Sequence, residues 1–138
     1  MTLPNLITGN TGAQQPYTPV AASAAGAAQQ NATSLPAVAG KTTYITGFDV
    51  TGGGATAASI IEITVTGLAT SAGGTLKFEM NVAAGVTASV NAQGGLTVTF
   101  PDPLPASAPN TQITVTVPSF GAGNTNADVS VYGIQAAN

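Results

Sequence analysis

Residues 75–82 read Thr-Leu-Lys-Phe-Glu-Met-Asn-Val, and their pattern indicates the architecture of much of the chain. Large apolar residues alternate strictly with polar ones, which is the period of a β-strand with one buried face. The residues predicted to face inward are Leu76, Phe78, Met80 and Val82. Lysine, glutamate and asparagine lie between them and are predicted to face outward.

Runs of the same kind recur on both sides of this segment. Thr, Val and Ile gather in short stretches bounded by Gly, Pro and Asn, which is typical of an all-β domain. Besides 75–82, the runs are 42–50, 58–66, 86–90, 96–100, 113–117 and 128–134. Six to seven strands after residue 40 predict a single antiparallel β-sandwich, of jelly-roll or Ig-like type.

The parity of each run predicts its buried face. In the run 42–50, Tyr44, Phe48 and Val50 share one parity, and in 58–66 Ile61 and its alternate neighbours do. Aromatic residues are few, so those within or beside the runs are predicted to be the largest pieces of a thin core. They are Tyr44, Phe48, Phe78, Phe100, Phe120 and Tyr132.

Residues 1–40 differ from the rest of the chain. They hold no charged residue, are interrupted by four prolines and show no sustained period. Ala21–Gln30 is rich in helix formers, but so short a helix without a hydrophobic face is marginal in water. We expect an N-terminal arm, extended or disordered alone and ordered on a partner, before a β-sandwich domain at 41–138. A plain flexible tail is the alternative. The arm residues predicted to bind the partner are Leu3, Leu6, Ile7, Tyr17 and Val20.

Composition argues against several classes of function. The 138 residues include no cysteine, histidine or tryptophan, which removes the usual zinc, haem and iron–sulfur sites and every His-based catalytic group. Two lysines, no arginine and a net charge of −3 argue against nucleic-acid binding through phosphates. No apolar run approaches the length of a membrane span. We therefore expect no cofactor, no nucleic-acid partner and no membrane partner.

Motifs with catalytic potential are weak. Gly40-Lys41-Thr42 resembles the end of a phosphate-binding loop, but Leu35 stands where the first glycine is needed and the string leads into a predicted strand. We predict that the chain is not an enzyme and that Glu62 and Glu79 are solvated carboxylates near Lys77. A small carboxylate-based enzyme is the weakest hypothesis. Its candidate residues are Asp49, Glu62, Glu79, Asp102 and Asp128. No calcium-loop motif joins the aspartates, so no metal site is predicted, although a site built from backbone carbonyls is left open.

The outward positions of the predicted strands are mostly threonine. Exposed strand edges are normally protected by charge, and this chain has little of it. We therefore expect a homo-oligomer in which neighbouring subunits or the arm cover these surfaces. The alternative is a monomer protected by loops and prolines.

Residues 46–58, Thr-Gly-Phe-Asp-Val-Thr-Gly-Gly-Gly-Ala-Thr-Ala-Ala, resemble a string from small structural proteins of tailed bacteriophages. Residues 117–127, Val-Pro-Ser-Phe-Gly-Ala-Gly-Asn-Thr-Asn-Ala, do so as well. The resemblance spans roughly residues 41–135 and implies a head decoration (cement) protein. Such a protein binds the major capsid protein on the outer shell, often as a trimer, and stabilises the contacts between capsomers.

The resemblance also implies a localisation, and it leaves an alternative function open. The chain would be made in the host cytoplasm and located on the capsid surface of the virion. The alternative is a tail, baseplate or head-spike component that binds a host-surface glycan through the segments 51–57 and 119–127. No residue role is implied by the resemblance.

Overall fold

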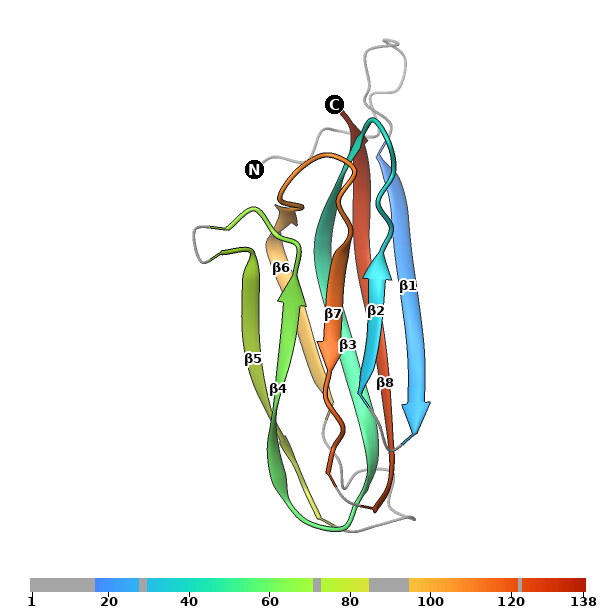
Figure 1. The fold of residues 1–138 in the computed structure, drawn as a ribbon, viewed down its shortest axis with the longest axis vertical. Helices are drawn as coiled ribbons and strands as arrows, with labels where there is room; N and C mark the ends of the chain where they lie inside the picture. Colours follow the sequence, from blue (N-terminus) through green and yellow to red (C-terminus); the bar gives the residue numbers. More distant parts are fainter. Residues whose placement is uncertain (1–16, 28–29, 71–72, 85–94, 122) are drawn as a thin grey trace.

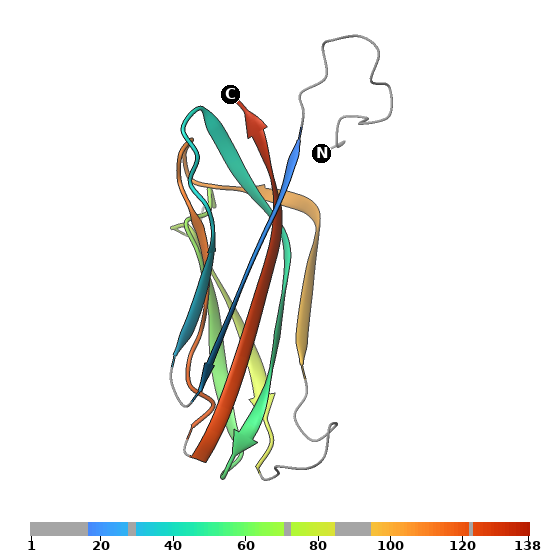
Figure 2. The ribbon, with the colours of Figure 1, turned by 90° about the vertical axis from the view of Figure 1, so that its right-hand side faces the viewer.

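The computed structural model describes residues 17–27, 30–70, 73–84, 95–121 and 123–138. Within them the chain forms two four-stranded sheets that pack face to face (Figures 1 and 2). Sheet A consists, in spatial order, of β1 (Thr18–Ala27), β8 (Gly123–Ala137), β3 (Lys41–Ala55) and β6 (Leu96–Pro105). Sheet B consists of β2 (Asn31–Leu35), β7 (Ile113–Val117), β4 (Ser59–Thr66) and β5 (Thr75–Val82).

The strand order distinguishes between the two expected sandwich types. All neighbouring strands are antiparallel, and the orders β1-β8-β3-β6 and β2-β7-β4-β5 interleave the two sheets along the chain. This arrangement is the eight-stranded jelly roll, in which early strands pair with late ones. The all-β sandwich is therefore confirmed. The described residues form eight strands rather than six to seven, and the predicted run 86–90 lies outside them.

The two additional strands lie in the segment expected to be an arm. β1 pairs with β8 over its whole length, and β2 pairs with β7. The sheets therefore begin at Thr18 rather than at residue 41. The helix-forming composition of Ala21–Gln30 is overridden, because the edge of β8 offers backbone hydrogen bonds that local propensity does not register. Residues 1–16 lie outside the described part of the chain.

Small side chains give β1 a strand pattern that hydrophobicity alone does not reveal. Val20, Ala22 and Ala24 pack against the core, while Ala21 and Ser23 are exposed. The period of two is present but is carried mostly by alanine. Because alanine occupies both faces of the strand, the alternation is invisible as a contrast between apolar and polar residues.

Buried polar side chains hold both ends of β2. The Asn31 side-chain amide donates to the carbonyl oxygens of Ala24 (2.8 Å) and Ala127 (3.0 Å) in sheet A. Past the other end of β2, the Pro36 carbonyl accepts hydrogen bonds from Thr43 Oγ1 and from Gln135 Nε2, both at 2.9 Å. A buried polar group is costly unless it is paired, so these bonds select the position of β2 as well as stabilising it.

The core between the sheets is aliphatic and fully buried. Its central residues are Ile45, Val50, Val129 and Val131 from sheet A, with Leu35, Ile63, Val65, Ile113 and Val115 from sheet B. The inward faces predicted for the runs 58–66, 75–82 and 113–117 are confirmed. These three runs coincide closely with β4, β5 and β7.

The phenylalanines complete the core on the side where β5 and β6 form the sheet edges. Phe48 packs edge-on against Phe78 with ring centroids 5.2 Å apart, and Phe100 lies within 6.5 Å of both rings. Such tilted pairs are favourable beyond the area they bury. The core role is confirmed for all four phenylalanines, including the buried Phe120, but is wrong for Tyr132, which is 42% exposed.

A bulge in β3 changes its parity. Thr43 and Ile45 are buried, and after the register shift between Ile45 and Gly47 the buried side chains are those of Phe48 and Val50. An extra residue in one strand reverses the facing of all that follow. Tyr44 was expected to share the parity of Phe48, but it is only half-buried, because the bulge lies between the two residues.

At the same register shift, the partner strand β6 departs further from regular pairing than β3 does. Gly47 pairs with Thr99 and Ile45 pairs with Leu104, so the four residues from Phe100 to Pro103 lie opposite the single residue Thr46. Two of the four are prolines, which have no N–H with which to continue the ladder. Figure 2 shows β6 turning sharply near its upper end.

Packing around Gly133 gives a test of the β3–β8 contact. A Cβ at this position would clash with the Tyr44 carbonyl oxygen and lie 2.5 Å from Leu35 Cδ1. We expect Gly133→Ala to lower the free energy of unfolding by about 3 kcal/mol, measured by urea denaturation. Gly26→Ala is the matched control, because its Cβ would meet Asn31 Cγ at an ordinary 3.5 Å. It should change stability by less than about 1 kcal/mol, and equal losses in the two variants would contradict this packing.

Candidate functional site

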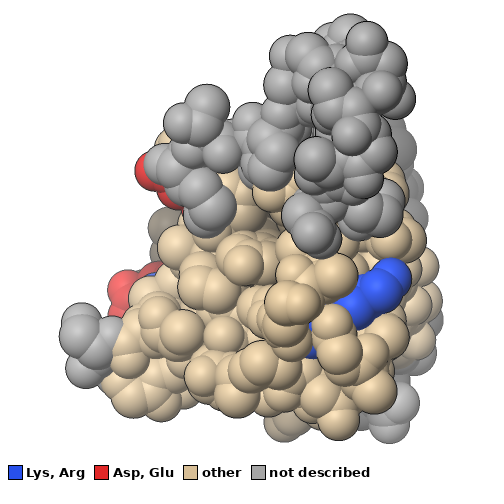
Figure 3. Space-filling model, turned by 90° about the horizontal axis from the view of Figure 1, so that it is seen from above, with Lys and Arg blue, Asp and Glu red and all other residues tan. Residues whose placement is uncertain are grey.

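Charged side chains are sparse on the described surface and do not gather in one cleft. Glu62 and Glu79 are directly opposite each other on sheet B, and Lys77 Nζ lies 3.0 Å from Glu62 Oε1, with both side chains exposed. This agrees with the expectation of solvated carboxylates near Lys77. Asp49 and Asp128 belong to sheet A, and Asp102 lies in the distorted part of β6. Figure 3 shows few charged groups at the upper end of the molecule.

The residues proposed for metal or phosphate chemistry are not assembled into a site. Among the described residues, no group of three or more Asp and Glu is placed to hold a metal ion. Gly40 and Lys41 lie at the turn from β2 into β3, with Gly40 at a φ of 72°, so the string leads into a strand as predicted. No helix among the described residues is long and apolar enough to cross a membrane.

Two large hydrophobic side chains are exposed on the described surface. They are Ile60, 67% exposed on β4, and Tyr132, 42% exposed on β8. A single exposed aliphatic residue is ordinary and needs no function. Tyr132 differs because polar groups and two hollows surround it.

Tyr132 lies beside a carboxylate on the neighbouring strand. The pKa of Tyr132 is raised above its ordinary value, chiefly by side-chain hydrogen bonding with Asp49. Desolvation and the negative charge of Asp49 raise this pKa further, whereas a hydrogen bond with Ser130 lowers it. Asp49 lies directly opposite Ser130, so Tyr132 and Asp49 are diagonal neighbours across β8 and β3.

A hollow lies on each side of Tyr132. One, of about 400 Å³, extends over β3 and β6 and is lined by Asp49, Thr97, Thr99 and Pro101 among others. The other, of about 280 Å³, lies toward β1. Its lining residues are Ala21, Ala22, Ser23, Ser130 and Tyr132. The larger hollow exists where the four residues of β6 from Phe100 to Pro103 depart from the ladder beside Gly47.

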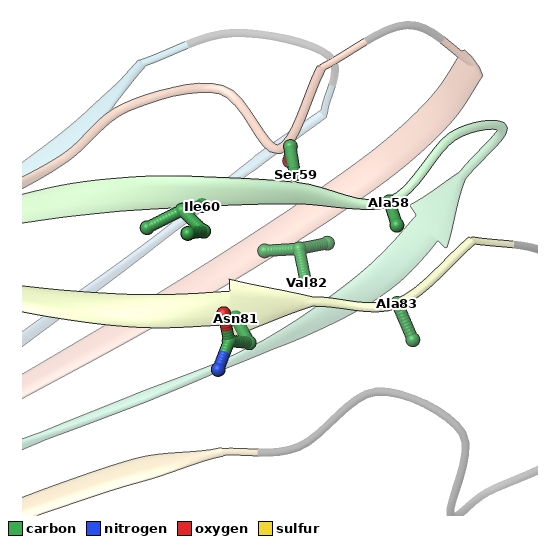
Figure 4. A pocket seen from close by; sticks show the side chains of 6 residues that line it. All are labelled: Ala58, Ser59, Ile60, Asn81, Val82 and Ala83. Carbon is green, nitrogen blue, oxygen red and sulfur yellow. The ribbon is translucent and has the colours of Figure 1, made fainter.

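A further hollow lies beside Ile60 where β4 and β5 meet (Figure 4). Its six lining residues include no titratable group. Ser59 Oγ donates to the carbonyl oxygen of Phe120 at 3.3 Å and so helps to hold that segment in place. This hollow offers apolar contact and one amide, Asn81, but no group for acid–base chemistry.

The predicted arm anchors have different positions. Leu3, Leu6 and Ile7 lie outside the described residues. Tyr17 is half-buried immediately before β1, and Val20 packs against the core from within β1. Val20 therefore contributes to the sandwich itself in this structure.

The two segments expected as glycan-binding loops are brought together, but mainly as strand ends. β3 continues to Ala55 and β8 begins at Gly123, and Gly52 pairs with Ala127. The Phe120 ring lies against Gly52 so closely that any side chain there would clash with it. Gly52 and Phe120 therefore act in packing between these segments.

The pair of Tyr132 and Asp49 was not predicted, although the sequence holds part of the signal. Val129 and Val131 are both fully buried, and strict alternation then turns Tyr132 outward. Nothing local indicates that Asp49 lies beside it, because that depends on the register between two strands about 80 residues apart.

Comparison with protein-family models, with curated protein sequences and with solved structures found no match for this chain. Its function is therefore inferred from the fold and the surfaces.

The effect of Asp49 on the pKa of Tyr132 can be tested by replacing Asp49. Replacing Asp49 by alanine should move the pKa of Tyr132 down toward its ordinary value, followed by the NMR signal of the tyrosine Cζ carbon. Because the folded-state pKa is raised, the interaction with Asp49 stabilises the fold at neutral pH, and its contribution is lost as the pH rises through that pKa. Asp128→Ala, an exposed carboxylate also on β8, is the control and should leave the tyrosine pKa unchanged.

Proposed function

We propose that the chain is a virion structural protein of a tailed bacteriophage, a capsid decoration protein that binds the outer shell and stabilises contacts between capsomers. The observation that carries the proposal is a jelly roll whose sheet faces bear hydroxyl and small side chains with very few charges. Jelly rolls recur in viral capsid proteins, although a fold alone does not define a function.

The outer face of sheet B is suited to a broad protein contact. Across its strands, Ser34, Thr114, Thr66 and Thr75 form one continuous row. Ser34 and Thr114 share a hydrogen bond of 2.7 Å between their hydroxyls. Short hydroxyl side chains cost little to desolvate when they are already paired, and the cores of protein interfaces are depleted in charge. The pair of Lys77 and Glu62 lies toward the β5 edge.

The edges of the sheets support self-association. β5 carries Lys77 and Glu79, and the far part of β6 carries three prolines, both of which discourage pairing with another chain. β1 reads Thr-Pro-Val-Ala-Ala-Ser-Ala-Ala-Gly-Ala; it has no charged residue, and its one proline, Pro19, lies at its beginning. We infer that the β1 side of sheet A takes part in the homotrimer.

The proposed mechanism is mechanical. A subunit that contacts two neighbouring capsomers adds its binding free energy to the work of separating them. Burial contributes about 25 cal/mol per Å² before the costs of ordering and association are subtracted. A trimer multiplies the effect, since its second and third contacts form at high effective concentration.

The arm hypothesis is now limited to the residues before β1. Leu3, Leu6 and Ile7 remain its proposed anchors to the major capsid protein, with Tyr17 at its base. Because β1 and β2 belong to the sheets, removing residues 1–40 would remove two strands and is expected to unfold the protein. Deletion of residues 1–16 is therefore the appropriate variant.

Capsid binding is the decisive test. Particles of the virus that encodes the chain, stripped of it, should bind the full chain saturably in co-sedimentation and then withstand a higher temperature. The chain lacking residues 1–16 should keep the same urea midpoint and bind at least about tenfold more weakly. No binding by the full chain would refute the decoration role. Equal binding by both forms would refute only the arm.

The same assay identifies the contact face. Thr116→Glu places a charge on the outer face of sheet B and should weaken capsid binding, because a buried unpaired charge is costly. Thr97→Glu, at an exposed position on β6 of sheet A, is its matched control. A greater loss from the control would assign attachment to the other sheet.

The oligomeric state is tested with the chain alone. Light scattering on a sizing column should give three times the chain mass of 13.4 kDa. The mass of a single chain would contradict the trimer in solution and leave attachment to be decided by sedimentation.

A further inference from the structure

The outer face of sheet A is organised in rows that run across its strands. One row consists of Ala21, Tyr132, Gly47 and Thr99, which are paired in register from β1 to β6. The next row consists of Ser23, Ser130, Asp49 and Thr97. Successive rows are about 7 Å apart, which is the span of two residues along a strand.

The smallest residues flank the tyrosine in its own row. Ala21 is opposite Tyr132 on β1, and Gly47 is opposite it on β3. No long side chain therefore fills the space on either side, which explains why both hollows reach Tyr132. A Cβ on Gly47 would lie 2.6 Å from the carbonyl oxygen of Val98, so this position also requires glycine for packing.

The adjacent row is entirely polar. It presents three hydroxyls and one carboxylate, that of Asp49. A carboxylate has two oxygens and several acceptor positions, so Asp49 can accept hydrogen bonds from a ligand's hydroxyls as well as interact with Tyr132.

We propose that this face binds a neutral glycan, with one pyranose ring stacked on Tyr132 and its hydroxyls bonded to Asp49 and to the serine and threonine hydroxyls of the adjacent row. A pyranose has an apolar face of C–H groups and a rim of hydroxyls. That combination matches an accessible aromatic ring beside a row of acceptors and donors. The site lies on the sheet face, away from the strand ends at 51–57 and 119–127.

The charge of the residues that line the two hollows favours a neutral ligand. Asp49 is the charged residue among those that line the two hollows, and no lysine lines either of them. A uronic or sialic acid would place a second negative charge near Asp49, with no cation there to compensate for it. The ligand class is therefore a neutral hexose or N-acetylhexosamine chain.

Titration calorimetry with the full chain tests the proposal. The probes are cellohexaose, maltohexaose, hexa-N-acetylchitohexaose and, as the anionic comparison, hexagalacturonate. At least one neutral hexasaccharide should bind, and Tyr132→Ala should weaken its binding about tenfold or more. Tyr132→Phe keeps the aromatic ring but removes its hydroxyl, and it should lower the affinity for the sugar about threefold. Asp49→Ala keeps the ring but removes the carboxylate, and it should lower the affinity by a similar factor.

Ile60→Ala is the matched control, because it removes the other exposed large hydrophobic residue, which lies on sheet B. It should bind as the parent does, and all variants should remain folded at the temperature of the titration. The proposal fails if no neutral probe binds, if hexagalacturonate binds as tightly, or if Tyr132→Ala has no effect. A concentration-dependent rise in mass without sugar, lost in Tyr132→Ala, would instead make this face a contact between copies of the chain. These measurements need no capsid, so they are independent of the decoration role.

Discussion

The pairing of β3 with β8 is the constraint on which the rest of the molecule depends. Both strands are 15 residues long and lie at the centre of sheet A, so β1 and β6 are positioned by attachment to their outer edges. Inward, the pair supplies Phe48 and Val131 to the core. Outward, the same register brings Tyr132 beside Asp49. One set of backbone hydrogen bonds therefore determines both the packing and the candidate binding surface.

The two outer faces of the sandwich are both poor in charge, but they present different chemical groups. Sheet B offers a continuous surface of paired hydroxyls, whereas sheet A offers an aromatic ring, a carboxylate and two hollows. Because the sheets lie back to back (Figure 2), attachment through sheet B would leave Tyr132 facing outward. Capsid attachment through sheet B and glycan binding on sheet A concern separate faces and are compatible in one subunit. A thin core of this kind is also stabilised by any partner that binds only the folded chain.

Strands with a clear contrast between apolar and polar residues were predictable almost to the residue. The runs 75–82 and 113–117 are β5 and β7 themselves, because each carries its alternation in large side chains. β1 was missed because alanine occupies both of its faces, and β2 because it is only five residues long and is followed directly by Pro36. The bulge at Ile45 and Gly47 was missed as well, since an insertion in a ladder is defined only against the partner strand. As a result, Tyr44 was assigned to the wrong parity.

By itself, the sequence determined an all-β chain with a thin aliphatic core, no cysteine or histidine chemistry and very little charge. These properties follow from composition and from a period of two, which neighbouring residues set locally. Tertiary structure alone decided that Thr18–Ala27 and Asn31–Leu35 are strands, that the order is a jelly roll and that Tyr132 meets Asp49. Each of these depends on partners far away in the sequence, and the register of such a pairing has no local signature.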